Sequence, residues 1–287
     1  ILTNINRNQW YYPDLTSGVA GWLRQMEKEE NQEAINYYQE ACQEIIEEFE
    51  WIQNSEEPKW GIPWIHENKG DSWKHPRLLN AGWAIEDFNA KDDKTPEEIK
   101  DKSDELRGFI SKKFAPGNNP TDWYVIAAGD GDGMGNWLKG KPLDNYEKFI
   151  PEALKPQLER LQNNDVKETF QEFLKLKKRM GPSTHSALSR ALLDFSNQLL
   201  PYLTENRYAG RLIYGGGDDV LAYTNLWEWD SWLWDVRQCF KGGEDSKNEF
   251  DNKGDYWRWI DGVNLPNNLS NRPLFTMGSK ATISFGI

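Results

Sequence analysis

Three consecutive glycines followed by two aspartates, at residues 215–219, constrain the fold more than any other stretch of the sequence. Apolar, β-prone residues lead into the glycines at 212–214, and a second apolar run leads away at 220–223. This is the pattern of a β-hairpin with a glycine turn. Two adjacent carboxylates at such a turn repel each other unless protons or a cation neutralise them. Because Asp and Gly are also common in ordinary solvated turns, this stretch alone leaves both interpretations open.

A second stretch, at residues 123–135, combines an apolar run with alternating Asp and Gly. The apolar, partly β-branched run predicts a buried strand that ends at Asp130. A calcium loop of the EF-hand type is disfavoured, because a strand precedes the aspartates and Glu147 lies too far along to close the loop. Carboxylates from two separate strands that converge on a pair of metal ions are what two-metal phosphoryl transfer requires.

Together these motifs, Gly-Asp-Gly-Asp-Gly-Met-Gly at 129–135 and Gly-Gly-Asp-Asp at 216–219, resemble a known family. They are similar to the palm domain of the large, polymerase-like subunit of type III CRISPR effector complexes, and most similar to its III-B form. The segments at 75–79, 185–192 and 277–284 fit the same family, so the resemblance covers about residues 73–287. Such palms are related to diguanylate cyclases, adenylyl cyclases and template-dependent polymerases.

The expected order of elements is strand, helices, strand–turn–strand, helix and strand, which predicts an α+β fold. We expect a ferredoxin-like (split βαβ) palm or nucleotide-cyclase domain with an antiparallel sheet at 116–287, incomplete at its C-terminal end. We expect residues 1–115 to form a mostly helical lobe, with a long helix over 22–53 and another that starts at Thr95 and Pro96. His66 and His75 have no further His or Cys nearby and are expected to be structural or exposed.

Charge and composition limit the classes of function. The net charge of −12 disfavours a free-standing nucleic-acid binder, but it allows a subunit whose basic partners hold the RNA. Two cysteines with no CxxC pattern predict neither a zinc site nor a disulfide framework, and favour a reducing, cytoplasmic compartment. The sequence contains no apolar run near 18 residues, so we expect no membrane span. Because it starts with Ile rather than Met, we expect it to be part of a longer protein.

Chemistry and resemblance both point to Asp130 and Asp218 as metal ligands for two Mg²⁺ or Mn²⁺ ions, and the resemblance adds the Gly131 carbonyl. Asp219 is expected either to bind the second ion or to help deprotonate the attacking 3′-hydroxyl. Asp132 either points the same way as Asp130 along the strand or folds into the loop.

Further residues are candidates for binding the nucleotide. Backbone N–H groups in the two glycine-rich loops are expected to face its phosphates, at Gly133, Met134, Gly135, Gly216 and Gly217. Lys280 is either a phosphate-binding cation or an exposed lysine at a strand end. Ser189 either hydrogen-bonds a base edge or has a plain surface role on its helix.

The resemblance implies a metal-dependent nucleotidyltransferase that converts ATP into cyclic oligoadenylate, a second messenger, when its complex binds target RNA. Its implied partners are the other CRISPR effector subunits, the guide RNA and the target RNA, with no membrane. The family's HD nuclease domain and the cysteines of its zinc knuckle are not found in this sequence. A catalytically silent, nucleotide-binding scaffold is the alternative. A diguanylate-type cyclase is disfavoured, because Asp-Asp rather than Glu/Asp-Glu-Phe follows the glycines.

Overall fold

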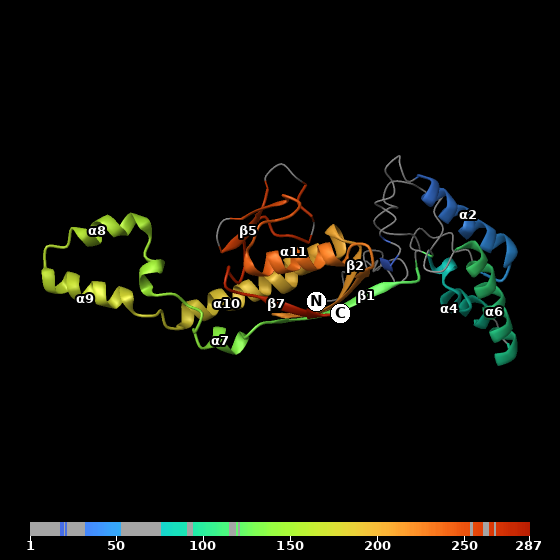
Figure 1. Ribbon diagram of the computed structural model, residues 1–287, viewed down its shortest axis with the longest axis horizontal. Coiled ribbons are helices and arrows are strands. Elements are labelled where there is room, and N and C mark those ends of the chain that lie inside the picture. Colours follow the sequence, from blue (N-terminus) through green and yellow to red (C-terminus); the bar gives the residue numbers. More distant parts are fainter. Residues whose placement is uncertain are drawn as a thin grey trace, which may run out of the picture.

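The computed structural model describes residues 18–19, 21, 32–52, 76–90, 94–114, 119, 121–252, 255–260, 264–266 and 268–287. Its buried apolar side chains gather in two separate cores, one in a helical lobe and one beneath a β-sheet. Figure 1 shows the helical lobe at one end, the sheet in the middle and a slender helical arm at the other end. His66 and His75 lie outside the described residues. The boundary expected near residue 115 stays a prediction.

The helical lobe consists of α2 (Gln32–Glu48), the short helices η6 (Pro76–Leu79), α4 (Ala81–Ala84) and α5 (Glu86–Asn89), and α6 (Pro96–Lys113). The predicted start of α6 is confirmed. Thr95 accepts the backbone N–H of Glu98, and the Glu98 carboxylate accepts the N–H of Thr95 at 2.8 Å, which is a capping box. The apolar faces of α2 and α6 meet in the lobe core, which includes Tyr38, Cys42, Ile45, Leu79, Leu106 and Ile110.

Four antiparallel strands form the central sheet. They are β1 (Tyr124–Gly131), β2 (Gly210–Gly216), β3 (Asp219–Asn225) and β7 (Ile283–Gly286). Their spatial order is β2-β3-β1-β7, so the strand that ends in the first Asp motif lies between the Asp-Asp hairpin and the last strand. This is the order of the ferredoxin-like fold, and the α+β fold with an antiparallel sheet is confirmed.

One face of the sheet is covered by helices. A continuous helical segment runs through α10 (Pro182–Asp194) and two π-helical turns, η9 (Phe195–Leu199) and η10 (Tyr202–Arg207), and α11 (Trp229–Lys241) packs beside it. Side chains of β1 alternate strictly between exposed and buried. Its buried positions face the helices, whereas Tyr124, Ile126, Ala128 and Asp130 lie on the open face.

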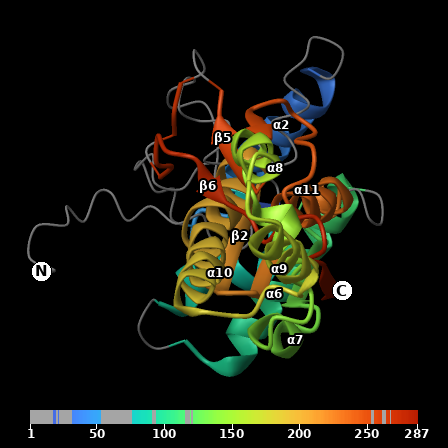
Figure 2. The ribbon, with the colours of Figure 1, turned by 90° about the vertical axis from the view of Figure 1, so that its left-hand side faces the viewer.

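The arm between β1 and α10 contains η7 (Tyr146–Phe149), η8 (Glu152–Leu154), α8 (Lys155–Glu159) and α9 (Asn164–Lys175). None of the residues in these four helices is buried. Figure 1 shows the arm extending away from the sheet, and Figure 2 views the molecule from the arm's end. Its two ends join at a bridge between Asn145 and Lys177.

The chain segment between α11 and β7 forms a second, smaller sheet. Its strands are β4 (Phe250–Asn252), β5 (Tyr256–Trp259) and β6 (Leu274–Phe275), in that order. Although the sequence over 242–271 is mostly polar, Trp257 and Trp259 pair β5 with β4 in this sheet, and both enter the main core. The buried Arg207 guanidinium fixes this region to α11 by ion pairs with Asp235, Asp245 and Glu249.

Among the helices of the described residues, no segment combines the length and the apolar character that crossing a bilayer requires.

Candidate active site

The two predicted Asp motifs meet where β1 ends beside the β2–β3 turn. Gly129 of β1 pairs with Val220 of β3, so Asp130 and Asp219 occupy the next position on each strand and lie across from one another. Both are exposed on the open face of the sheet. Directly opposed residues of an antiparallel pair have Cβ atoms about 4.5–5.5 Å apart. The strand pairing therefore brings these two carboxylates together.

Asp218 lies in the turn itself, and its side chain lies against the backbone of Gly131. A Cβ atom at Gly131 would be 2.7 Å from the Asp218 Cβ, so only glycine leaves room for this carboxylate. Burial raises the pKa of Asp218, and the negative charges of Asp219 and Asp130 raise it further. The backbone N–H groups of Asp218 and Gly131 offset part of this shift. The charges of two neighbouring carboxylates thus act on Asp218 at this point.

Asp132 is held by the edge strand β7. The hydroxyl of Ser284 donates to its carboxylate at 3.1 Å, and Ser284 is itself the β7 residue that pairs with Asp130. The pKa of the Asp132 carboxyl is lowered, first by a hydrogen bond from the Thr282 side chain and then by Ser284. Asp132 therefore lies on the same side of the strand as Asp130, and its charge is already stabilised by β7.

The loop after β1 turns at Gly133, whose φ of 66° is in the left-handed region, and leads into the short helix α7 (Met134–Leu138). The N–H groups of Met134 and Gly135 lie in the first turn of α7, where a helix offers no acceptor for them. Gly216 ends β2, and Gly217 forms the hairpin turn with a φ of 71°. These five predicted phosphate-facing residues thus lie at or directly beside the two turns that flank the carboxylates.

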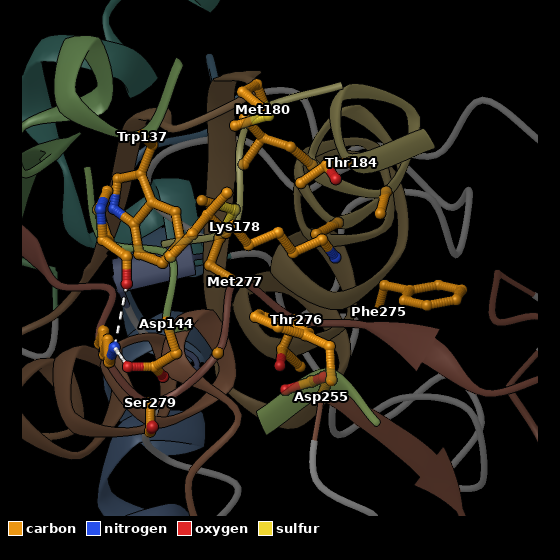
Figure 3. A pocket seen from close by; sticks show the side chains of 18 of the residues that line it. Trp137, Asp144, Lys178, Met180, Thr184, Asp255, Phe275, Thr276, Met277 and Ser279 are labelled. Carbon is orange, nitrogen blue, oxygen red and sulfur yellow. Dashed lines mark hydrogen bonds and ion pairs between the residues drawn. The ribbon is translucent and has the colours of Figure 1, made fainter. Parts of the chain in front are cut away.

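Next to α7 is a pocket of about 500 Å³, which lies between α7, the first half of α10 and the segment before β7 (Figure 3). Trp137 and Phe275 lie on opposite sides in this view, with Lys178 between them. The pocket-lining residues of α10 are Thr184, Ala187, Leu188 and Ala191, which share one face of the helix, together with Ser183. Sequence analysis missed the pocket, although the spacing of these residues at three, four and seven was visible.

Lys280 lies at the pocket, and its charge is already engaged. Its Nζ is 2.7 Å from the Asp144 carboxylate and donates to the Pro142 carbonyl at 3.0 Å. The pKa of Asp144 is lowered, chiefly by this hydrogen bond from Lys280. Ser189, by contrast, is exposed on α10 and is not one of the residues that line the pocket.

Within the part of the chain that the structure describes, no three His, Cys, Asp or Glu side chains form a group that could hold a metal ion. The donor chemistry nevertheless fits a hard divalent cation, because Asp130, Asp218 and Asp219 offer only carboxylate oxygens. The pKa of Asp218 is raised first by burial and then by the charges of Asp219 and Asp130, and a divalent cation bound here would offset both effects.

Comparison with known proteins agrees with this geometry. Residues 123–253 match the family described as Cas10/Cmr2, second palm domain. A relative from Pyrococcus furiosus, the CRISPR system Cmr subunit Cmr2, is 31% identical over 122 residues, which is 42% of this chain and 12% of the relative. The chain therefore spans a small part of that protein.

Two solved structures share the fold over 94% of this chain and 30% of theirs. They are the type III-B Cmr-beta complex in its apo state, with a TM-score of 0.50 and 16% identity, and the same complex bound to cognate target RNA, with a TM-score of 0.52 and 17% identity. At this identity the likeness shows the fold alone. With the family match, the expected resemblance is confirmed. Over residues 123–253 the chain is therefore similar to the second palm domain of the Cas10/Cmr2 family.

Proposed function

We propose that this chain is the nucleotidyltransferase part of the polymerase-like subunit of a type III CRISPR RNA-guided effector complex. In this proposal it polymerises ATP and closes the product into cyclic oligoadenylate when the complex holds target RNA. The observation that carries the proposal is the position of Asp130 across from Asp219, with Asp218 packed against Gly131. Convergent carboxylates on neighbouring strands are what two-metal phosphoryl transfer uses.

Each carboxylate has a role in this proposal. Asp130 and Asp218, with the Gly131 carbonyl, would hold the metal ions, and Asp219 would hold the second ion or accept the proton of the attacking 3′-hydroxyl. When bound, two Mg²⁺ or Mn²⁺ ions supply stabilisation of charge on the attacking and leaving oxygens. The chain itself binds and orients the reactants and forms no covalent bond to them, as is usual in phosphoryl transfer.

The nucleotide has room beside these groups. The loop at 133–135 and Gly216 and Gly217 would face the phosphates, and the neighbouring pocket has the size and the aromatic lining to hold the rest of the nucleotide. Lys280 would then exchange its contact with Asp144 for a phosphate oxygen. Because Ser189 does not line the pocket, its role at a base edge has no support from this arrangement.

The proposed partners are the other effector subunits, the guide RNA and the target RNA. With a net charge of −12, this chain is unsuited to bind RNA by itself at physiological salt, so basic partner subunits would supply that affinity. The complex as a whole would then bind RNA, and the palm would synthesise the cyclic oligoadenylate.

One observation fits a second candidate, a nucleotide-binding but silent scaffold. The arm exposes large apolar side chains, among them Leu154, Val166, Phe173 and Leu176. Exposed apolar residues in this number are typical of subunit contacts. Such contacts are compatible with either function, so activity has to separate the two.

The deciding experiment compares the assembled complex with its double variant Asp218→Ala/Asp219→Ala. Each is incubated with labelled ATP or GTP, Mg²⁺ or Mn²⁺, and target RNA. We expect the variant to assemble but to lose synthesis by about 10²-fold or more, because metal ligands stabilise both reacting oxygens. The matched control is Asp101→Ala/Asp104→Ala on the exposed surface of α6. A wild-type complex that binds ATP without turnover supports the scaffold, and near-normal synthesis by the double variant places the site elsewhere.

A further inference from the structure

The strand that leads into the Asp-Asp turn contains a β-bulge. Leu212 of β2 pairs with Ala222 of β3, but the next pair is Tyr214 with Leu221, so Ile213 is an extra residue on β2. Such bulges fix the register beyond them and re-aim the strand. Only the part of the hairpin between the bulge and the turn is affected, which is the part that carries the carboxylates.

The bulge determines which residues make the turn. Beyond it Gly216 pairs with Asp219, which leaves Gly217 and Asp218 as a two-residue turn with positive φ at Gly217 only. This is the pattern of a type II′ turn, one of the two that fit a tight hairpin. If the pairing of Leu212 with Ala222 continued without a bulge, Gly216 would face Asp218, and Gly217 alone could not close the turn. The bulge thus leaves Asp218 in the turn, where it lies against Gly131, next to Asp219, which the β1–β3 register places across from Asp130.

Glu205 lies at the bulge. Its carboxylate accepts the backbone N–H of Leu212 at 3.1 Å, from the π-helical turn η10. In the described sheet β2 is an edge strand, so an N–H on its outer side has no neighbouring strand to bond with. Burial raises the pKa of Glu205, because a partly buried position disfavours the charged form of the carboxyl group.

The same helical segment also contacts β2 on the far side of the bulge. A Cβ atom at Gly215 would be 3.2 Å from the Leu200 Cδ2 and 3.4 Å from the Ser196 carbonyl oxygen. The helix therefore holds β2 before the bulge through Glu205 and after it through the close packing of Gly215. Between these two points the strand has little freedom to move its extra residue.

We propose that Glu205 is a positioning residue for the Asp218–Asp219 pair. It acts by holding the Leu212 N–H, so that the bulge stays at Ile213 and the turn stays at Gly217 and Asp218. It does not touch the reacting groups. The proposal rests on the proposed function for its consequence in catalysis, but the effect on the hairpin can be measured without any turnover.

The test uses the full-length protein with Glu205→Leu, which removes the acceptor, and Glu205→Gln, which keeps an oxygen acceptor of the same reach. The matched control is Gln198→Leu, because Gln198 lies in the same helical segment and accepts the N–H of Ser270 at 2.9 Å, away from β2. Two readouts are compared, namely amide hydrogen exchange over residues 210–221 and the dissociation constant for Mn²⁺.

We expect Glu205→Leu to speed exchange in the hairpin and to weaken Mn²⁺ binding about 10-fold, the lower end of what is lost when a residue that orients a metal ligand is removed. Glu205→Gln and Gln198→Leu should stay within about 2-fold of wild type, because each keeps the bulge acceptor. Wild-type exchange and Mn²⁺ affinity in Glu205→Leu would overturn the proposal, as would an equal loss in Gln198→Leu. If Glu205→Leu does not fold, Glu205→Ala takes its place, with the same expected direction and the same contradicting result.

Asp218→Ala/Asp219→Ala, measured in parallel, separates this inference from the proposed function. If that variant keeps wild-type Mn²⁺ affinity, the proposed function fails, whereas the exchange data still decide whether Glu205 holds the bulge. If it loses Mn²⁺ and Glu205→Leu does not, only the role of Glu205 is refuted.

Discussion

The Asp218 carboxylate occupies the space that a side chain at Gly131 would need: a Cβ atom there would lie 2.7 Å from the Asp218 Cβ and 2.9 Å from its Oδ2. Gly131→Ala should therefore displace Asp218 while leaving the strand pairing intact. We expect at least about 10-fold loss of synthesis and of Mn²⁺ affinity, since misplacement by 1 Å can cost 10²-fold. The control is Gly286→Ala on the adjacent strand, where a Cβ atom would meet nothing within 4 Å. Equal behaviour of the two variants would contradict this prediction.

A second prediction concerns pH and metal-free stability. Because burial and neighbouring charges raise the pKa of Asp218 above the usual 3.8, the folded protein holds this proton more tightly than the unfolded chain does. The contribution of Asp218 to stability is then present at low pH and lost as pH rises through the raised pKa. Without divalent metal, Asp218→Asn should raise the melting temperature at pH 7 and change little near pH 3. Melting curves with EDTA and with Mg²⁺ check this, and a destabilised Asp218→Asn at pH 7 in EDTA would refute it.

A third prediction tests Lys280 against its neighbour. Lys280→Ala should raise the KM for ATP about 10-fold with a smaller change in kcat, as expected for loss of one charge-assisted hydrogen bond. Asp144→Asn should lower KM, because it removes the carboxylate that competes for Lys280. Lys148, the other cation near Asp144 at 3.5 Å, provides the control, and Lys148→Ala should leave KM near its normal value. An unchanged KM in Lys280→Ala would show that Lys280 does not bind the phosphates of ATP.

A fourth prediction concerns the buried ion cluster. Arg207→Met would leave Asp235, Asp245 and Glu249 without the cation that they share. Breaking such a cluster from one side typically costs about 3–5 kcal/mol in the free energy of unfolding. Lys102→Ala removes an exposed ion pair with Glu105 and should cost no more than about 0.5 kcal/mol. Urea unfolding of both variants gives the comparison, and similar midpoints would show that the cluster adds nothing to stability.

Local patterns in the sequence predicted the elements that local chemistry determines. The Gly-rich Asp-Asp hairpin, the β1 strand and the helix start at Thr95 each depend on neighbours in the chain, and the structure has all three. The order of the central strands also followed, because the alternation of strands and helices leaves few topologies open. The roles of the carboxylates stay predictions.

Long-range partners were not visible in the sequence. The bulge at Ile213 depends on the hydrogen bond that Glu205 accepts from Leu212. The ion pair of Lys280 is with Asp144, which precedes it by 136 residues. The small sheet of β4, β5 and β6 was missed because its strands are short and separated by polar loops, so no periodic pattern distinguishes them. The Trp257 side chain, fully buried, shows that tertiary packing decided that region.

The position of β1 between β3 and β7 has a consequence for how the protein is made. Residues 128–131 of β1 pair with residues 283–286 of β7, so synthesis must add more than 150 residues before this edge is covered. Pairings so distant in sequence form slowly, and an uncovered edge invites wrong partners in the meantime. During translation the strand that carries Asp130 therefore has one unpaired edge until β7 has been made. We therefore expect a chaperone to protect the nascent chain chiefly at β1.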